Sequence, residues 1–198
     1  MSSLMQSALG AQFEQLPPAL KGHYRAGNTL EQGHLDIEYP RWMQPFLTLL
    51  RLLGALVNRS GPKVPTQVEK FDSPSGQRWR RTISFPDGKV VYFNSRWVPG
   101  QGNRLIEFVN PMVGLEMAVH VANGKLYYEG VRFVVKLGSL LIPIPEWLLL
   151  GHTSIEEQGL DEHHFAMDFR LTHPLFGQIF RYAGTFAIEP EPVVNRLE

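Results

Sequence analysis

The stretch LEMAVHVANGKLYYEGVRFVVK, residues 115–136, decides the fold class of this chain. On both sides of Ala122-Asn123-Gly124, apolar and polar residues alternate as they do in a strand with one buried face. Asn-Gly is a preferred dipeptide in two-residue hairpin turns. The stretch therefore predicts an antiparallel hairpin, and similar runs with short turns between them extend over about residues 66–189.

Repetition of this pattern predicts a mainly β protein with about ten strands in an antiparallel meander. Helical patterns do not alternate with the strands, which argues against a doubly wound parallel sheet. A meander of this length must close or be covered, because open strand edges pair with other chains. We therefore expect a barrel or a strongly curved sheet.

Two segments have helical patterns. Residues 1–28 should form short helices, because Pro17-Pro18 stands where the start of a helix tolerates proline. Residues 41–57 should form one apolar helix that caps the barrel, and its leucines lie nearly all round, so we expect burial on most sides. Residues 140–150 contain two prolines and should be a loop or a short helical turn.

The length of 198 residues suits a single domain, with a helical segment 1–28, an antiparallel β domain 29–189 and a polar tail 190–198. The 19 basic and 19 acidic side chains cancel, so no overall field draws nucleic acid to the protein. The absence of cysteine excludes disulfides and thiolate metal sites. No secretion signal and no apolar run long enough to span a membrane are visible, so we expect a cytoplasmic protein.

The order of several segments carries a resemblance to a known family. These segments are LPPALKGHYRAG, the apolar helix ending at Val57, QRWRRTISF, FNSRW, LIEFVNP, KLYYEGVRF, LIPIPEWL, EEQGLDEHHFAMDFRL and FGQIFRYAGTF. From about Leu16 to Phe186 the chain resembles a bacterial domain-of-unknown-function family, whose members occur alone or fused behind saccharopine-dehydrogenase-like NAD-binding domains. The resemblance implies a role in small-molecule or lipid metabolism beside a redox partner. It supplies no catalytic residues, and this chain has no Rossmann portion.

Three charged residues share predicted strand faces with apolar residues. Arg81 lies in register with Trp79, Arg132 with Val134, and Glu107 with its apolar neighbours. An unpaired buried charge is costly, so these groups should be paired or line a wet cavity. Either the two arginines anchor a carboxylate or phosphate, tuned by Glu107, or an internal Arg–Glu ion pair fixes the register of the barrel. A β-bulge would shift the register by one residue and weaken both interpretations.

The preferred interpretation is binding of a hydrophobic or amphipathic small molecule, lipid-like or a metabolite, in a cavity inside the sheet. The predicted ligand-binding residues are Trp79, Arg81, Phe93, Trp97, Glu107, Tyr128, Arg132 and Phe169, with Phe108 as a further lining residue. Tyr24, Tyr128 and Tyr182 can donate hydrogen bonds or act as acids in such a pocket.

No motif identifies a catalytic residue. The histidines lack the spacing of a metal site, and no serine is framed by glycines as in a nucleophile elbow, so we expect no metal and no cofactor. Asp168 and Arg170 should point outward from their strand, where they can pair with Arg181.

Two further interpretations remain open. The first is an enzyme, such as an isomerase, cyclase or hydrolase of a lipid-like or polyketide-like substrate, for which Glu107 with Tyr128 or Arg132 is the plausible pair. The second is an interaction module that docks a dehydrogenase-like partner through its N-terminal third. We expect no nucleic-acid partner and no transmembrane segment, whereas peripheral membrane contact through residues 42–57 fits the apolar helix. An exposed apolar patch there would favour docking.

Overall fold

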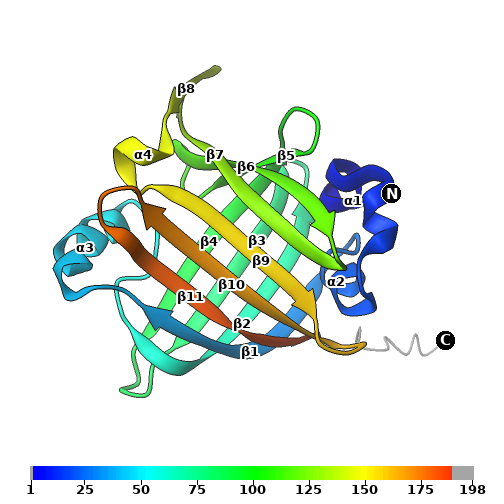
Figure 1. Cartoon of the computed structure of the whole chain (residues 1–198), viewed down its shortest axis with the longest axis horizontal. Coiled ribbons are helices and arrows are strands. Elements are labelled where there is room, and N and C mark those ends of the chain that lie inside the picture. The colour runs from blue at the N-terminus through cyan, green and yellow to red at the C-terminus, as the bar shows by residue number, and fades with distance from the viewer. Residues whose placement is uncertain (1, 189–198) are drawn as a thin grey trace.

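In the part of the chain that the structure describes, eleven β-strands form one antiparallel sheet, and ten of them close into a barrel (Figure 1). The computed structural model describes residues 2–188. The strands are β1 Thr29–Glu38, β2 Gly61–Ser73, β3 Gly76–Ser84, β4 Val90–Pro99, β5 Arg104–Phe108, β6 Val113–Ala122, β7 Lys125–Leu137, β8 Leu140–Ile144, β9 His152–Gly159, β10 His164–His173 and β11 Gly177–Ile188. Each barrel strand pairs with its neighbours in chain order, and β11 returns to β1. Strand β8 pairs with β7 outside this circle. The predicted meander and its closure are confirmed.

The hairpin between β6 and β7 turns at Asn123 and Gly124. Their φ angles of 51° and 72° are the left-handed pair that a two-residue hairpin turn requires. The two strands pair from Ala122↔Lys125 to Val113↔Val135, with one register shift opposite Glu116 and Met117. The sequence prediction for this hairpin is confirmed, and the shift has consequences for the predicted site.

One end of the barrel is filled by the N-terminal segment (Figure 1). It consists of α1 Leu4–Leu9, a 3-10 helix Gly10–Gln15 and α2 Pro18–His23. The side chains of Phe13, Leu20 and Tyr24 are buried in the main hydrophobic core. These short helices gain their stability from this packing, because helices of their length are not stable alone.

The opposite end of the barrel carries α3 Gln44–Leu52, preceded by a 3-10 helix Arg41–Met43, and α4 Glu146–Leu149. The predicted helix 41–57 is too long at its C-terminal end, because Gly54 and Leu56 adopt positive φ and turn the chain back toward the barrel. The expected burial on most sides is wrong: within α3 the buried residue is Leu47, and Leu52 is 80% exposed. None of the described helices is long and apolar enough to cross a membrane.

Strand β11 runs to Ile188, the last residue that the structure describes, so the predicted end of the β domain at residue 189 lies outside the described residues. The predicted polar tail 190–198 lies outside the described residues. Residues 140–150 contain the predicted helical turn as α4, and they also contain β8, which was not expected.

Candidate binding site inside the barrel

Two adjoining spaces lie inside the barrel. A cavity of about 230 Å³ lies beneath α3 and α4, and a polar space of about 40 Å³ lies deeper, toward the N-terminal helices. Glu107 and Tyr182 line both spaces, so an apolar outer cavity and a polar inner space adjoin at these two side chains.

The outer cavity is almost wholly apolar. Its lining comes from α3, the segment after it, the barrel strands and α4: Phe46, Leu50, Leu53, Leu56, Val57, Phe93, Val113, Leu115, Phe133, Val135, Leu149, Leu150, Phe169 and Leu171. Alternation along the strands places these side chains inward. A cavity of this kind favours an apolar group, because few of its walls can hydrogen-bond.

A buried ion pair stands where the two spaces meet. Nη1 of Arg81 donates to Oε1 of Glu107 at 3.3 Å and to Oγ of Ser95 at 3.1 Å. The guanidinium also lies 5.0 Å from the ring centroid of Phe93, within the range of a cation–π contact. Burial is the largest single influence and lowers the pKa of Arg81, but Glu107 together with the nearby Tyr182 and Tyr24 raises that pKa above its usual value, so the arginine remains charged. An internal Arg–Glu ion pair, one of the two alternatives that the sequence leaves open, is therefore present.

A second polar group surrounds Glu157. Oη of Tyr24 donates to its carboxylate at 2.9 and 2.7 Å, and Oη of Tyr128 hydrogen-bonds to Oη of Tyr24. Burial raises the pKa of Glu157 and is the largest of its causes. Burial also raises the pKa of both tyrosines, followed by the charge of Glu157. The three side chains form a hydrogen-bonded network capable of holding a proton.

His23 and Glu31 complete the inner end. Nδ1 of His23 lies 2.5 Å from Oε1 of Glu31, and Oγ1 of Thr29 donates to the same oxygen at 3.1 Å. Both side chains of the His23–Glu31 pair are almost fully buried. The pair is brought together by the turn between α2 and β1, which places residues 23 and 31 on facing elements.

Three buried polar atoms at the inner end have no hydrogen-bond partner among the described residues: Nε1 of Trp79, Nε1 of Trp97 and Oε2 of Glu31. The two indole rings are 5.4 Å apart, and all three residues line the polar space. Leaving such groups unpaired costs about 1–3 kcal/mol each. Two free N–H donors beside Arg81 suit a group that accepts hydrogen bonds.

The structure brings most of the predicted site residues together. Trp79, Arg81, Trp97, Glu107 and Tyr128 line the inner space, and Phe93 and Phe169 line the outer cavity. Their role in binding a ligand stays a prediction.

The placement of Arg132 in the site is wrong. The register shift in β7 pairs Glu116 with Arg132 but Met117 with Gly130, so one residue bulges between them. From there on the faces exchange, because a bulge moves following side chains to the opposite side. Arg132 is half exposed and forms an ion pair with Glu116.

Phe108 also lies outside the predicted pocket. It packs with Ile106 and Val134 in a small cluster separate from the main core. Within β5, Leu105 and Glu107 face inward, so the residues between and after them face outward. The expected outward pairing of Asp168 is confirmed, since its carboxylate contacts both Arg170 and Arg181.

Sequence reasoning missed three members of the inner end: His23, Glu31 and Glu157. The alternation of side chains along a strand identifies two of them, because residues an even number of positions apart lie on the same face. Glu31 is an even number of residues from Leu35, and Glu157 is two residues from Ile155. Each is an acidic residue on the same strand face as apolar residues, which is the signal that also predicts the inward position of Glu107.

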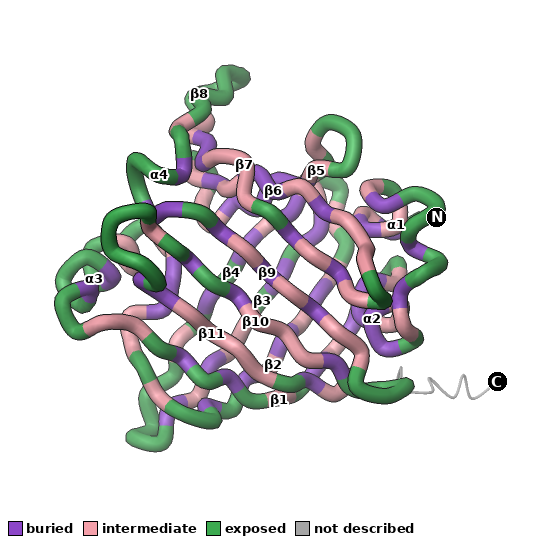
Figure 2. The backbone as a smooth tube through the Cα atoms, viewed as in Figure 1, coloured by how far each residue is buried: buried purple, intermediate pink, exposed green. Residues whose placement is uncertain are grey.

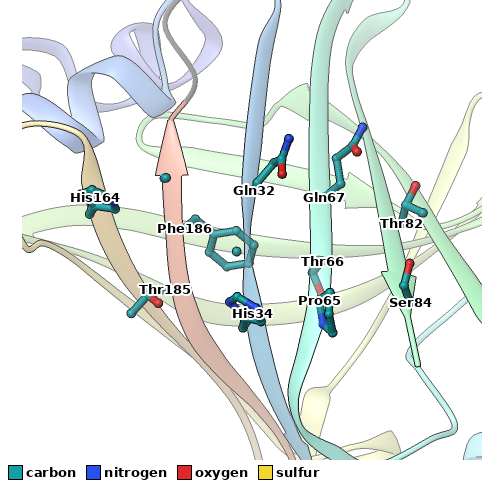
Figure 3. Close-up of a pocket in the computed structure, with 12 residues that line it drawn as sticks. Gln32, His34, Pro65, Thr66, Gln67, Thr82, Ser84, His164, Thr185 and Phe186 are labelled. Atoms are coloured by element: carbon teal, nitrogen blue, oxygen red, sulfur yellow. The ribbon is translucent and has the colours of Figure 1, made fainter. Parts of the chain in front are cut away.

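The outer face of the barrel has a groove of about 470 Å³ across β11, β1, β2 and β3 (Figure 3). Figure 3 labels side chains from these strands that line the groove, among them Gln32, His34, Gln67, Thr82 and Thr185. The described side chains that line it include two histidines, His34 and His164, and no Asp, Glu, Lys or Arg. The interior is the better candidate because it combines an apolar cavity with buried unpaired donors.

The fold places the chain among closed antiparallel β-barrels with an interior cavity. The chain belongs to the family described as domain of unknown function DUF4166, which matches residues 16–186. No curated protein matches the chain. Among solved structures it is compared with an isomerase-inactive variant of GphF DH1, at 9% identity and a TM-score of 0.19, covering 89% of this chain and 82% of that one. This likeness carries no argument about fold or function.

Proposed function

We propose that the barrel binds a small amphipathic molecule, with its apolar part beneath α3 and α4 and its polar end at Arg81, Trp79 and Trp97. The observation that carries the proposal is that an apolar cavity adjoins a buried polar space that holds unpaired donors. Sites for small molecules have this composition, with mostly apolar walls and a few convergent polar groups.

The geometry also restricts the ligand. The outer cavity of about 230 Å³ is smaller than sites for drug-sized ligands, which begin at about 300 Å³. This favours a single short chain over a two-chain lipid. The free indole N–H groups and Arg81 favour a carbonyl, carboxyl or hydroxyl at the polar end, since these groups accept hydrogen bonds.

Calorimetric titration with decanoic acid and with decylamine tests this proposal. Decanoic acid can accept hydrogen bonds at the inner end, whereas the alkylammonium group only donates, so we expect the acid to bind about tenfold more tightly or better. Leu115→Trp should fill the cavity and abolish binding. Leu160→Trp, an exposed position at the other end, is the matched control. Binding of the acid that persists in Leu115→Trp would contradict the proposal.

A second candidate, an enzyme that moves a proton on a lipid-like substrate, is favoured by one observation. Glu157 has a raised pKa and hydrogen-bonds to Tyr24 beside the polar space, which is the environment of many catalytic acids. The pair Glu107 with Arg132 no longer qualifies, because Arg132 lies outside. Conversion of 3-decenoic to 2-decenoic acid, followed by absorbance, should be lost in Glu157→Gln. No conversion by the unmodified protein would contradict this candidate.

A further inference from the structure

Exposed apolar side chains gather at one end of the barrel. Among the described residues, every large apolar side chain that is exposed lies at or near the α3 and α4 end, except Leu160. These are Trp42, Phe46, Leu49, Leu52, Leu53, Val90, Tyr92, Met112, Leu137, Leu140, Leu141, Ile142, Trp147, Leu148, Leu149, Leu175 and Phe176. We call this set the apolar rim. A patch of this extent marks an interaction surface.

The apolar rim is assembled from separate segments of the chain. The segment 41–53, the hairpin of β7 and β8, helix α4 and the turn between β10 and β11 lie at this end, and β8 projects outward from it (Figure 1). The rings of Trp42 and Phe176 pack 5.3 Å apart and join two of these segments. The tube coloured by burial is mostly exposed along these loops (Figure 2). The rim residues therefore share one end of the barrel, although they are scattered in the sequence.

The loops that carry the rim are positively charged on a chain with no net charge. Residues 39–60, 85–89, 109–112, 136–151 and 174–176 contain five basic side chains, Arg41, Arg51, Arg59, Lys89 and Lys136, against two acidic ones, Asp87 and Glu146. Asp87 is paired with Arg59 at 2.7 Å, and Glu146 is buried against His152. The excess of positive charge suits a surface with negative charge.

The rim also surrounds the cavity. Phe46, Leu53 and Leu149 are each partly exposed on the rim and also line the cavity beneath it. An apolar ligand could pass from an apolar phase into the barrel along these side chains without crossing water. This step rests on the proposed function, because it requires that the cavity takes up a ligand.

We propose that the apolar rim rests on a bilayer surface that contains anionic lipids, and that the ligand enters the barrel from it. Tryptophans such as Trp42 and Trp147 suit the boundary between headgroups and acyl chains, and basic side chains beside them attract anionic headgroups. A second copy of the chain fits less well. A symmetric pair would bring the same five basic side chains against each other.

Flotation with vesicles tests the docking surface. We expect the full chain to float with vesicles of phosphatidylcholine and phosphatidylglycerol, and about tenfold less with phosphatidylcholine alone. The double variant Leu52→Glu with Trp147→Glu should lose flotation, because both side chains are exposed and their replacement places charge on the rim. Leu160→Glu at the opposite end is the matched control and should float like the unmodified protein. Raising the salt concentration should weaken flotation.

Titration of the same variants with decanoic acid in solution separates the two proposals. If the rim variants bind decanoic acid but not vesicles, docking and cavity binding are both supported and are distinct. If the unmodified protein binds decanoic acid but floats with neither vesicle, membrane docking is overturned and the proposed function stands. Docking is also overturned if sedimentation shows a dimer that Leu52→Glu dissociates, since the rim would then be covered by a second copy.

Discussion

Arg81 and Glu107 show how a single buried pair sets both the stability of the barrel and the polarity of its interior. Their side chains are 13% and 11% exposed, and the pair lies where the two interior spaces meet. A buried charge without its partner is far more costly than the pair itself. The pair therefore belongs equally to the fold and to the candidate site.

Removal of one partner should be more destabilising than removal of both. We expect Arg81→Met to lower the free energy of unfolding by about 3–5 kcal/mol, because it leaves Glu107 buried and unpaired. The double variant Arg81→Met with Glu107→Leu should recover most of this loss. Urea denaturation of the single and double variants measures the coupling. Additive losses would mean that the two side chains do not depend on each other.

Lys70 gives the protein a pH dependence that can be isolated. Burial lowers its pKa to about 8, and its ammonium group donates to the carbonyl oxygens of His23 and Arg25. Between pH 8 and the usual 10.5, the unfolded chain holds a proton that the folded protein has lost. Stability from this residue should therefore increase as the pH rises through that window.

Chemical denaturation at several pH values, compared between the unmodified protein and Lys70→Met, checks this expectation. The difference between the two proteins removes the contribution of the other titrating groups. We expect the unmodified protein to gain stability relative to the variant as the pH rises from 8 toward 10. A difference that is constant, or that falls, would show that the lysine is not destabilised by its burial.

The alternation of apolar and polar residues correctly predicted which charged side chains face the interior, except for Arg132, which follows a β-bulge in β7. It placed Arg81 and Glu107 inside because nothing interrupts the pleat between them and their buried neighbours. It failed for Arg132 because of the bulge next to Gly130, for which the glycine inside the strand is the signal in the sequence. The partners of Glu157 were out of reach, since Tyr24 precedes it by 133 residues.

At the scale of elements, α4 is held to the barrel by one carboxylate. Oε1 of Glu146 accepts from the backbone N–H of Thr153 at 3.1 Å, and Oε2 lies 2.8 Å from Nδ1 of His152. A Cβ atom at Gly130 would lie 1.9 Å from Oε1, so the glycine makes room for this carboxylate. Gly130, next to the bulge that turns Arg132 outward, thus makes room for the attachment of α4.

Removal of the carboxylate should release α4. We expect Glu146→Ala to cost about 1–3 kcal/mol, because the buried N–H of Thr153 loses its acceptor. Hydrogen exchange of residues 146–151 should accelerate more than that of the barrel strands. Glu129→Ala is the control, since Glu129 is half exposed and contacts the same His152. Equal exchange in both variants would show that Glu146 does not anchor the helix.

The lengths of elements were predicted less well than their types. Apolar residues that continue past Leu52 predict one helix over residues 41–57, but the chain turns at Gly54 and Leu56. The glycine is the signal for this turn, because helices commonly end at a glycine with positive φ. Strand β8 contains Pro143 and lies outside the closed barrel, paired with β7 alone. Such a position tolerates proline, because one edge of the strand needs no partner.

For the whole molecule, the two ends of the barrel differ in a way that gives the interior a direction. The N-terminal helices close the polar end with buried side chains, and the apolar rim surrounds the other end. A ligand would therefore enter through the rim with its polar group first, toward Arg81, and its apolar part would follow into the outer cavity. The closed meander was predictable from hairpin turns and from the need to hide strand edges. Closure of one end by the N-terminal helices was not predictable, because it depends on contacts between distant segments.

The central claim is that this interior holds a small amphipathic molecule. Native mass spectrometry of the full chain, purified from its own host without detergent, tests it most directly. We predict a stoichiometric adduct that is released on denaturation, is identified as a single-chain molecule with a hydrogen-bond acceptor, and is absent from Leu115→Trp. A protein that shows only its own mass, both as purified and after addition of excess decanoic acid, would contradict the claim.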